Sequence, residues 1–220
     1  MSKKRIGVLI SGRGSNLGAL IEACKSADYP AEIEIVISNV PSAQGLLRAE
    51  ASLIPTLVID HKTFTSREAF DAALDAALKE AGVELVCNAG FMRLHTEGFV
   101  RRWWNRHLNI HPSLLPAFKG LHTHARVLDE GVKITGCTVH FVRPEMDEGP
   151  IVAQAAVPVL DRDTADDLAA RVLEAEHRVY PYALKLVAAG EVCVEGDHVV
   201  RKTQIGAEPP LFSPPLDEPL

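Results

Sequence analysis

The sequence predicts an α/β protein with a mostly parallel central sheet of about seven strands and helices on both faces. Apolar runs rich in β-branched residues alternate along the chain with segments of helical period, which is typical of consecutive βαβ units. Hydrophobic residues make up 47% of the 220 residues and charged residues 24%. This balance predicts a sizeable core and excludes a disordered, collagen-like or disulfide-scaffold protein.

The N-terminal half of the chain alternates regularly between the two element types. Short runs rich in Val, Ile and Leu predict strands at residues 5–10, 32–37, 56–59, 85–88 and 107–110. Between them, apolar residues that recur every three or four positions predict helices at residues 16–25, 42–51 and 66–81.

The C-terminal half has a different composition. A stretch rich in Pro, Gly and His follows residue 110 and cannot be regular structure throughout. Two longer strands are expected at residues 134–142 and 151–157, joined by the loop RPEMDEGP. A long helix is expected at residues 164–188, with Asp163 or Thr164 as its N-cap and acidic residues in its first turn.

No linker and no internal repeat divides the chain, so we expect a single domain over residues 1–206. The change of composition predicts two lobes on one continuous sheet, at about residues 1–105 and 106–206. Residues 207–220 are rich in Pro with few apolar residues, which predicts a loose tail.

The charge and the cysteines exclude several classes of protein. With 23 Lys and Arg against 29 Asp and Glu, the net charge is −6, so the chain lacks the basic surface of a nucleic-acid-binding protein. No apolar run approaches the roughly 20 residues that cross a bilayer, and we expect a cytoplasmic protein with no membrane contact. The four cysteines lie far apart, which predicts reduced structural thiols.

The first chemical signal is SGRGSN, residues 11–16, which joins the first expected strand to the first expected helix. Glycines let the backbone approach a ligand closely, and the free N–H groups of a helix start attract an anion such as a phosphate. A dinucleotide site would also begin with such glycines, but it expects an acid at the end of the second strand, where Ser38 and Asn39 stand. A tight turn without a ligand is the remaining alternative.

The second signal is the segment LNIHPSLLP. Alternation along a strand puts Asn109 and His111 on one face, and Pro112 keeps the backbone of His111 extended. Ligands of α/β proteins bind outside the carboxyl ends of the strands, where these side chains are expected. An amide N–H and an imidazole that carries a proton near neutral pH are suited to stabilising a developing oxyanion.

Asp147 in the loop RPEMDEGP is the third signal. A carboxylate beside His111 would favour the protonated ring and fix its orientation, although a lone Asp in such a loop is more often a turn residue. Several histidines gather between residues 107 and 140, which raises a zinc site as an alternative. Their spacing includes no H-E-x-x-H and no thiolate pair, so we expect no metal.

Together these segments resemble the folate-dependent formyltransferases, and among them the glycinamide ribonucleotide formyltransferases of purine biosynthesis. The resemblance runs from Ile6 to about Tyr182. The matching stretches are ISGRGSNL, TSREAFD, AGFMR, LNIHPSLLPAFKGLHTH, TVHFV, DEGP and EHRVYP. Asn109, His111 and Asp147 are common to all folate-dependent formyltransferases. The combination of GSN with HPSLLP and GLHTH is what narrows the resemblance to the glycinamide ribonucleotide formyltransferases.

The resemblance implies a Rossmann-like formyltransferase fold and transfer of a formyl group from 10-formyltetrahydrofolate, a cosubstrate, to the amine of 5-phosphoribosylglycinamide. The N-terminal lobe would bind the ribonucleotide and the C-terminal lobe the folate, with Asn109, His111 and Asp147 as catalytic residues. The implied ribonucleotide-binding residues are Gly14, Ser15, Asn16, Leu173, Glu174, Ala175 and Glu176. The implied folate-binding residues are Arg67, Met92, Arg93, Leu94, His95, Asn109, Arg143, Pro144, Glu145, Met146 and Asp147.

Some positions depart from the family pattern. His95 stands where an aliphatic residue usually lines the folate pocket, Glu148 replaces a frequent Gly, and Arg13 lies inside the expected phosphate loop. Asn88, at a buried strand end, needs a hydrogen-bond partner that the sequence does not identify. We expect small-molecule substrates and a monomer or weak homodimer.

Three other functions compete with this one. A formyltetrahydrofolate hydrolase would use water as acceptor, and its group usually carries a regulatory domain ahead of this one, whereas Arg5 already begins the first strand. A methionyl-tRNA formyltransferase would need a basic nucleic-acid-binding domain, which residues 190–220 do not provide. A non-catalytic ribonucleotide-binding homologue would not need all three of Asn109, His111 and Asp147.

Overall fold

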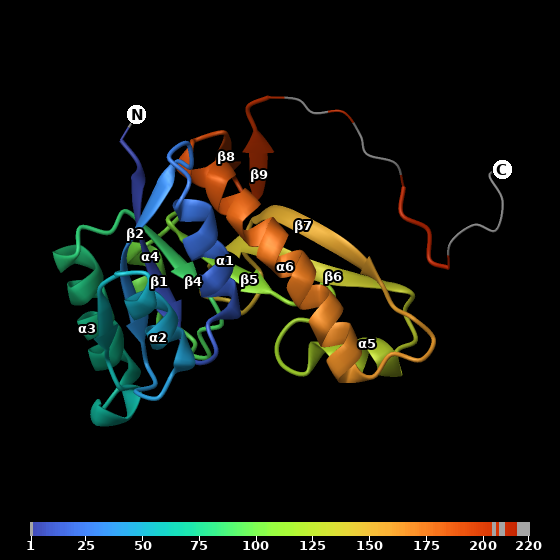
Figure 1. Ribbon diagram of the computed structural model, residues 1–220, viewed down its shortest axis with the longest axis horizontal. Helices are drawn as coiled ribbons and strands as arrows, with labels where there is room; N and C mark the ends of the chain where they lie inside the picture. Colours follow the sequence, from blue (N-terminus) through green and yellow to red (C-terminus); the bar gives the residue numbers. More distant parts are fainter. Residues whose placement is uncertain (1, 204–205, 207–209, 215–220) are drawn as a thin grey trace.

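The computed structural model describes residues 2–203, 206 and 210–214, and one seven-stranded sheet forms its centre (Figure 1). The sheet strands are β1 (Lys4–Ile10), β2 (Ala31–Ser38), β3 (Thr56–Val58), β4 (Leu85–Asn88), β5 (His107–His111), β6 (Ile134–Phe141) and β7 (Ile151–Pro158). The helices are α1 (Ser15–Cys24), α2 (Gln44–Ala51), α3 (Arg67–Glu80), α4 (Glu97–Arg102), α5 (Thr123–Asp129) and α6 (Ala165–Ala188), with a 3₁₀ turn η1 (His61–Thr63).

The strand order is β3-β2-β1-β4-β5-β6-β7. The strands from β3 to β5 in this order pair in parallel, whereas β6 runs antiparallel to both of its neighbours, β5 and β7. The chain therefore leaves β1 towards one side for β2 and β3 and then returns to the other side for β4. The predicted α/β fold with a mostly parallel sheet of about seven strands is confirmed.

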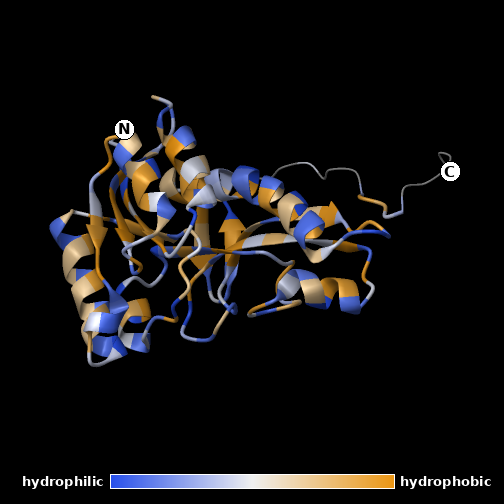
Figure 2. Ribbon diagram, turned by 60° about the horizontal axis from the view of Figure 1, so that its bottom comes forward, coloured by the Kyte–Doolittle hydropathy of each residue, from blue (hydrophilic) through white to orange (hydrophobic). Residues whose placement is uncertain are grey.

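The strands β1, β2 and β4 are buried on both faces, because their residues enter two different cores. Val8 and Ile10 pack with α1, α2 and α6, whereas Leu9 between them packs with α3 and α4. Figure 2 shows the same pattern, with apolar colour concentrated in the central strands and polar colour along the outer sides of the helices. Helices on both faces follow directly from this continuous apolar character.

The helix α6 crosses the face of β6 and β7 and also packs against α1 (Figure 1). Thr164 caps it by accepting a hydrogen bond from the backbone N–H of Asp167, whose side chain accepts from Thr164 in return. The Tyr180 hydroxyl donates to the backbone carbonyl of Asn88 over 2.9 Å, which ties the helix to the end of β4. Thr164 was one of the two expected caps.

The predicted element boundaries agree with the structure to within two residues. The short helices α4 and α5 were not predicted, and neither was the hairpin of β8 (Val192–Glu195) and β9 (His198–Arg201), which forms a separate two-stranded sheet. Of the expected tail, residues 207–209 and 215–220 lie outside the described residues. None of the helices in the described part of the chain is both long and apolar enough to span a membrane.

Candidate active site

A cavity of about 620 Å³ opens at the carboxyl ends of β4 and β5, where the parallel part of the sheet meets its antiparallel part. At one end, the cavity is lined by Asn16 on α1 and Glu176 on α6. Near the end of β5, it is lined by Asn109 and His111 of that strand and by Asp147 from the loop after β6. Residues far apart in the sequence therefore meet at one cavity.

Asn109 and His111 project from the same face of β5, as the alternation predicts. Asn109 is the register partner of His140 on β6, and its Nδ2 lies 3.2 Å from the His140 Nε2. The His140 Nδ1–H donates to the Phe141 backbone carbonyl over 3.0 Å. Burial lowers the pKa of His140, so this ring is neutral and its Nε2 accepts from Asn109. The Asn109 amide is thereby held with its second N–H available.

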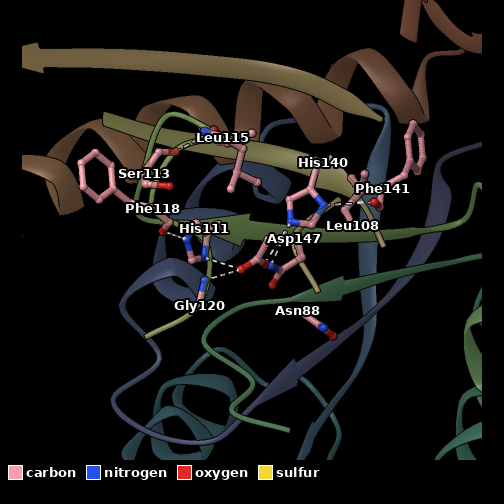
Figure 3. Close-up of polar contacts among 12 residues, drawn as sticks. Asn88, Leu108, His111, Ser113, Leu115, Phe118, Gly120, His140, Phe141 and Asp147 are labelled. Atoms are coloured by element: carbon pink, nitrogen blue, oxygen red, sulfur yellow. Dashed lines mark hydrogen bonds and ion pairs between the residues drawn. The ribbon is translucent and has the colours of Figure 1, made fainter. Parts of the chain in front are cut away.

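Asp147 contacts both His111 and the backbone N–H of Gly120 (Figure 3). Its Oδ2 is 3.4 Å from the His111 Nδ1 and accepts from the Gly120 N–H over 2.9 Å, while its Oδ1 is 3.8 Å from the His140 Nε2. The other nitrogen of His111, Nε2, donates to the Phe118 carbonyl oxygen over 3.0 Å. Both ring nitrogens of His111 thus face acceptors, an arrangement that a doubly protonated imidazole satisfies.

The turn after β5 is held by buried hydrogen bonds to the next two strands. The Thr138 hydroxyl on β6 donates to the Ser113 carbonyl over 2.7 Å and accepts from the Leu115 N–H over 3.0 Å. On β7, the Gln154 amide donates to the Leu115 carbonyl over 2.9 Å. The HPSLLP segment is therefore fixed against the sheet, which positions His111 at its start.

The loop that carries Asp147 connects β6 to β7. Asp147 has a φ of 58°, in the left-handed region, and Gly149 packs so closely that a Cβ there would collide with the Phe141 carbonyl. The Arg143 guanidinium stacks 3.8 Å from the centre of the Trp104 ring. Glu148, one of the departures from the family pattern, pairs with Lys119 over 2.8 Å, so it ties this loop to the segment after β5.

The SGRGSN loop forms the other end of the site. Gly14 precedes α1 with a φ of 69°, and a Cβ there would lie 2.6 Å from the Gly45 Cα, so only glycine fits. No side chain among the described residues caps α1, and its first turn carries no acidic residue. The backbone N–H groups at this helix start are therefore open to an anion. Arg13 is exposed and is not among the residues that line the cavity.

Asn16 and Glu176 connect this loop to α6. The Asn16 Nδ2 donates to the Glu176 Oε2 over 2.7 Å in a buried contact, and the Asn16 Oδ1 has no hydrogen-bond partner among the described residues. Burial raises the pKa of Glu176, and the hydrogen bond from Asn16 opposes that shift. Asn16 and Glu176 thus form a hydrogen-bonded pair that lines the cavity beside the start of α1.

The structure brings most of the predicted site residues to this one cavity. Those that line it are Asn16, Met92, Arg93, Leu94, His95, Asn109, His111, Arg143, Pro144, Glu145, Met146, Asp147 and Glu176. Those not among its lining residues are Gly14, Ser15, Arg67, Leu173, Glu174 and Ala175. Arg67 is exposed at the start of α3, and Glu174 is exposed on α6. The roles of all these residues stay predictions.

His140 and the peptide groups at Phe118 and Gly120 complete the site and were not predicted. His140 lies in the TVHFV stretch, and alternation along β6 predicts only which face it occupies, whereas the register with β5 places it opposite Asn109. The peptide groups carry no side-chain signal. No cluster of three or more metal-ligating His, Cys, Asp or Glu side chains occurs among residues 2–203, 206 and 210–214.

Comparisons with known proteins agree with this geometry. A family model described as formyl transferase matches residues 4–184. The trifunctional purine biosynthetic protein adenosine-3 of Gallus gallus is 54% identical over 88% of this chain, which spans only 19% of that relative's length. Phosphoribosylglycinamide formyltransferase of Haemophilus influenzae is 43% identical over 86% of this chain and 89% of its own length.

Among solved structures, glycinamide ribonucleotide transformylase 1 from Symbiobacterium toebii superposes with a TM-score of 0.88. It is 50% identical, and the match covers 90% of this chain and 94% of that one. The motifs quoted above lie within the matched region. The chain belongs to the formyl transferase family and, within it, to the phosphoribosylglycinamide formyltransferases.

Proposed function

We propose that this chain transfers the formyl group of 10-formyltetrahydrofolate to the amine of 5-phosphoribosylglycinamide. One observation carries the proposal: Asn109, His111 and Asp147 meet in a cavity that extends to Asn16 at the start of α1. One end of this cavity offers hydrogen-bond donors for a reacting carbonyl, and the other lies beside an anion site. Formyl transfer to a phosphorylated amine requires both.

The anion site supports a phosphorylated acceptor. The phosphate would bind the backbone N–H groups of Ser15 and Asn16, where the helix dipole favours negative charge. The Glu176 carboxyl, which lines the cavity and is held by Asn16, would accept hydrogen bonds from the ribose and the glycinamide. A net charge of −6 repels anions in general, so a local device of this kind has to supply the attraction.

The folate would occupy the remainder of the cavity. Its wall combines apolar groups such as Phe91 and Val100 with the loops at residues 92–95 and 143–147, a lining that suits a flat heterocycle with polar edges. Arg67 would act, if at all, on the exposed glutamate tail of the cosubstrate, since it is not part of the lining. The residues present therefore fit this cosubstrate.

The chemical step follows from the donors at the end of β5. The acceptor amine attacks the formyl carbon, the bond from that carbon to the folate nitrogen breaks, and one proton moves from the amine to that nitrogen. The free Asn109 N–H and the His111 Nε2–H would donate to the carbonyl oxygen as it gains negative charge, with the oxygen taking the place of the Phe118 carbonyl at Nε2. Asp147 would keep His111 doubly protonated and assist the proton transfer.

Two physical effects supply the rate. Each well-placed oxyanion donor contributes roughly 3–4 kcal/mol of transition-state stabilisation. Holding the amine and the formyl carbon in line removes about 7–11 kcal/mol of entropic barrier. Neither effect calls for a metal ion.

A spectrophotometric assay tests the proposal. Tetrahydrofolate should form when 10-formyltetrahydrofolate and 5-phosphoribosylglycinamide are both present, and omission of the ribonucleotide should abolish the signal. Equal signal without the ribonucleotide would identify a hydrolase instead. Ribonucleotide binding without turnover would identify a non-catalytic homologue.

A further inference from the structure

The cavity wall contains a second set of polar side chains that the proposed reaction does not use. Asn88 at the end of β4 and His95 in the loop that follows both line the cavity. His107 on β5 and Asp71 on α3 are their hydrogen-bonding neighbours. The side chains of His95 and Asp71 are 3% and 5% exposed, and His107 is 1% exposed, so this is a buried polar group in an otherwise apolar region.

Hydrogen bonds join the four side chains into one linear network, in the order His107, Asn88, His95 and Asp71. The His107 Nε2 lies 2.9 Å from the Asn88 Oδ1, and the Asn88 Nδ2 lies 3.5 Å from the His95 Nε2. The His95 Nδ1 lies 3.4 Å from the Asp71 Oδ1. The backbone N–H of Thr96 donates to the second Asp71 oxygen over 2.6 Å.

The direction of each hydrogen bond follows from the two ends of this network, which are His107 and Asp71. Burial, with smaller effects of the His95 and His140 rings, holds the pKa of His107 well below its usual range, so this ring is neutral. The His107 Nδ1 has no partner among the described residues, whereas its Nε2 faces an amide oxygen and must donate to it. The Asn88 amide is therefore oriented with its nitrogen towards His95.

The carboxylate end enforces the same orientation. Burial acts to raise the pKa of Asp71, but the hydrogen bonds from His95 and Thr96 outweigh it, and the net pKa is lowered. The ionised Asp71 accepts the His95 Nδ1–H, which leaves the His95 Nε2 as the acceptor for Asn88. Both ends thus fix the Asn88 amide in one of its two possible orientations.

Stability alone does not account for these four side chains. The His95 ring stacks between the rings of Phe91 and Phe99, at centroid distances of 5.1 and 4.4 Å. Apolar side chains of similar volume would fill such a space without polar groups that need partners, and replacing buried polar sets in this way is often neutral or stabilising. A role towards a ligand explains why two of them, Asn88 and His95, form part of the cavity wall.

The proposed catalytic amide is held in the same way. Asn88 and Asn109 are register partners on the neighbouring parallel strands β4 and β5, so their side chains project to one side of the sheet. Each places its Nδ2 against the Nε2 of an imidazole whose Nδ1–H donates to an acceptor, which is Asp71 for His95 and the Phe141 carbonyl for His140. In both cases one amide N–H is held and the other is left over.

We propose that Asn88 is a specificity-determining residue for the formyl donor. Its second amide N–H donates to an acceptor on the heterocyclic ring of the folate, which carries a carbonyl oxygen and ring nitrogens. His95 and Asp71 are positioning residues that hold the amide in the donating orientation. This inference rests on the proposed function, because it names the part of the cosubstrate that the wall recognises.

The test separates binding of the folate from the chemical step. Asn88→Leu should raise the KM for 10-formyltetrahydrofolate about 3- to 10-fold, the loss of one hydrogen bond. The KM for the ribonucleotide and kcat should change less than about twofold. His95→Leu and Asp71→Asn should raise the folate KM by smaller factors, because they release the amide without removing it. The Kd of tetrahydrofolate, measured by calorimetry on the same variants, should follow the same order.

Asp75→Asn is the matched control. Asp75 lies one turn after Asp71 on α3, and its side chain is 6% exposed, close to the 5% of Asp71. It pairs instead with Lys79 and Arg102, each over 2.7 Å, and is not part of the cavity lining. This variant should change thermal stability and leave the folate KM and Kd unchanged.

Several outcomes would overturn the inference. An unchanged folate KM and Kd in Asn88→Leu would do so, as would an Asp75→Asn effect equal to that of Asp71→Asn. If Asn88→Leu does not fold, unchanged values in His95→Leu overturn it instead. A wild-type protein that binds tetrahydrofolate but forms no product contradicts the proposed function alone, and the calorimetric comparison still decides the role of Asn88.

Discussion

Two imidazole rings in the cavity wall, His111 and His95, are each paired with a carboxylate. His111 with Asp147, and His95 with Asp71, have the same Nδ1 to oxygen distance of 3.4 Å and are both buried. They differ at the second ring nitrogen, which faces the Phe118 carbonyl in His111 but the Asn88 amide in His95. A ring with two acceptors is satisfied by two protons, and a ring with one acceptor and one donor by a single proton. In our proposals, the ring of the His111–Asp147 pair therefore donates to the reacting carbonyl, whereas the ring of the His95–Asp71 pair holds the Asn88 amide.

Removal of the imidazole from each pair should separate them most clearly. His111→Ala should lower kcat about 100- to 1,000-fold, the effect of losing one oxyanion donor, while the KM for the ribonucleotide stays within about threefold. His95→Leu should leave kcat within about twofold. Steady-state kinetics with both substrates measures the contrast. A kcat near the wild-type value in His111→Ala would remove this residue from the proposed mechanism.

Neutralising each carboxylate should give a smaller contrast of the same kind. Asp147→Asn keeps an oxygen that can accept from Gly120 but loses a charge-assisted hydrogen bond to His111, worth about 1.5–3 kcal/mol, so kcat should fall about 10- to 100-fold. Asp71→Asn should change kcat by less than twofold, because Asp71 acts on folate binding in our proposal. Similar kcat losses in the two variants would contradict the division of roles.

The pH dependence of stability should identify the structural contribution of Asp71. Its pKa is lowered in the folded state, so its ionised form stabilises the fold fully above the unfolded-state pKa of about 3.9. That contribution is lost as the pH falls through the lower folded value. Urea unfolding between pH 3 and 7 should show a steeper acid loss for the wild type than for Asp71→Asn. Glu130→Gln, at an exposed position, should follow the wild type.

The smallest expected effect comes from Glu176, whose pKa shift has the opposite sign. Burial raises its folded pKa, so the folded state holds the proton more tightly than the unfolded chain. The stability of the wild type should therefore decline as the pH rises from about 4.3 through the raised value. Glu176→Gln should lack this decline and keep the bond from Asn16, which urea unfolding at pH 4 and pH 7 can measure. An unchanged pH dependence would contradict the assignment.

The sequence was sufficient to predict elements whose signal is local. Alternation and Pro112 placed Asn109 and His111 on one face of β5, and the composition of the strands predicted a sheet covered on both faces. The hairpin of β8 and β9 was missed, although VCVEGDHVVR alternates around a Gly-Asp turn.

Contacts across the fold could not be predicted in the same way. The distance from His111 to Asp147 depends on how two loops pack. Phe118 and Gly120 contribute backbone peptide groups, which cannot be recognised from the type of residue. Asn88 needed a partner that the sequence did not identify, and the structure supplies it from the neighbouring strand and the following loop. The family resemblance implied which side chains are catalytic, and their roles stay predictions, but it gave no reason for a histidine at position 95.

The hydrogen bonds that α6 makes set a fixed spacing across the cavity. Glu176 is bonded to Asn16 at the start of α1, and Tyr180, four residues later on the same helix, is bonded to the Asn88 carbonyl at the end of β4. Four residues of an α-helix rise about 6 Å. Because both bonds come from one rigid helix, a movement of α6 along its axis displaces both attachment points together. The spacing between the start of α1 and the end of β4, across which the two substrates of the proposed reaction must be aligned, is then preserved.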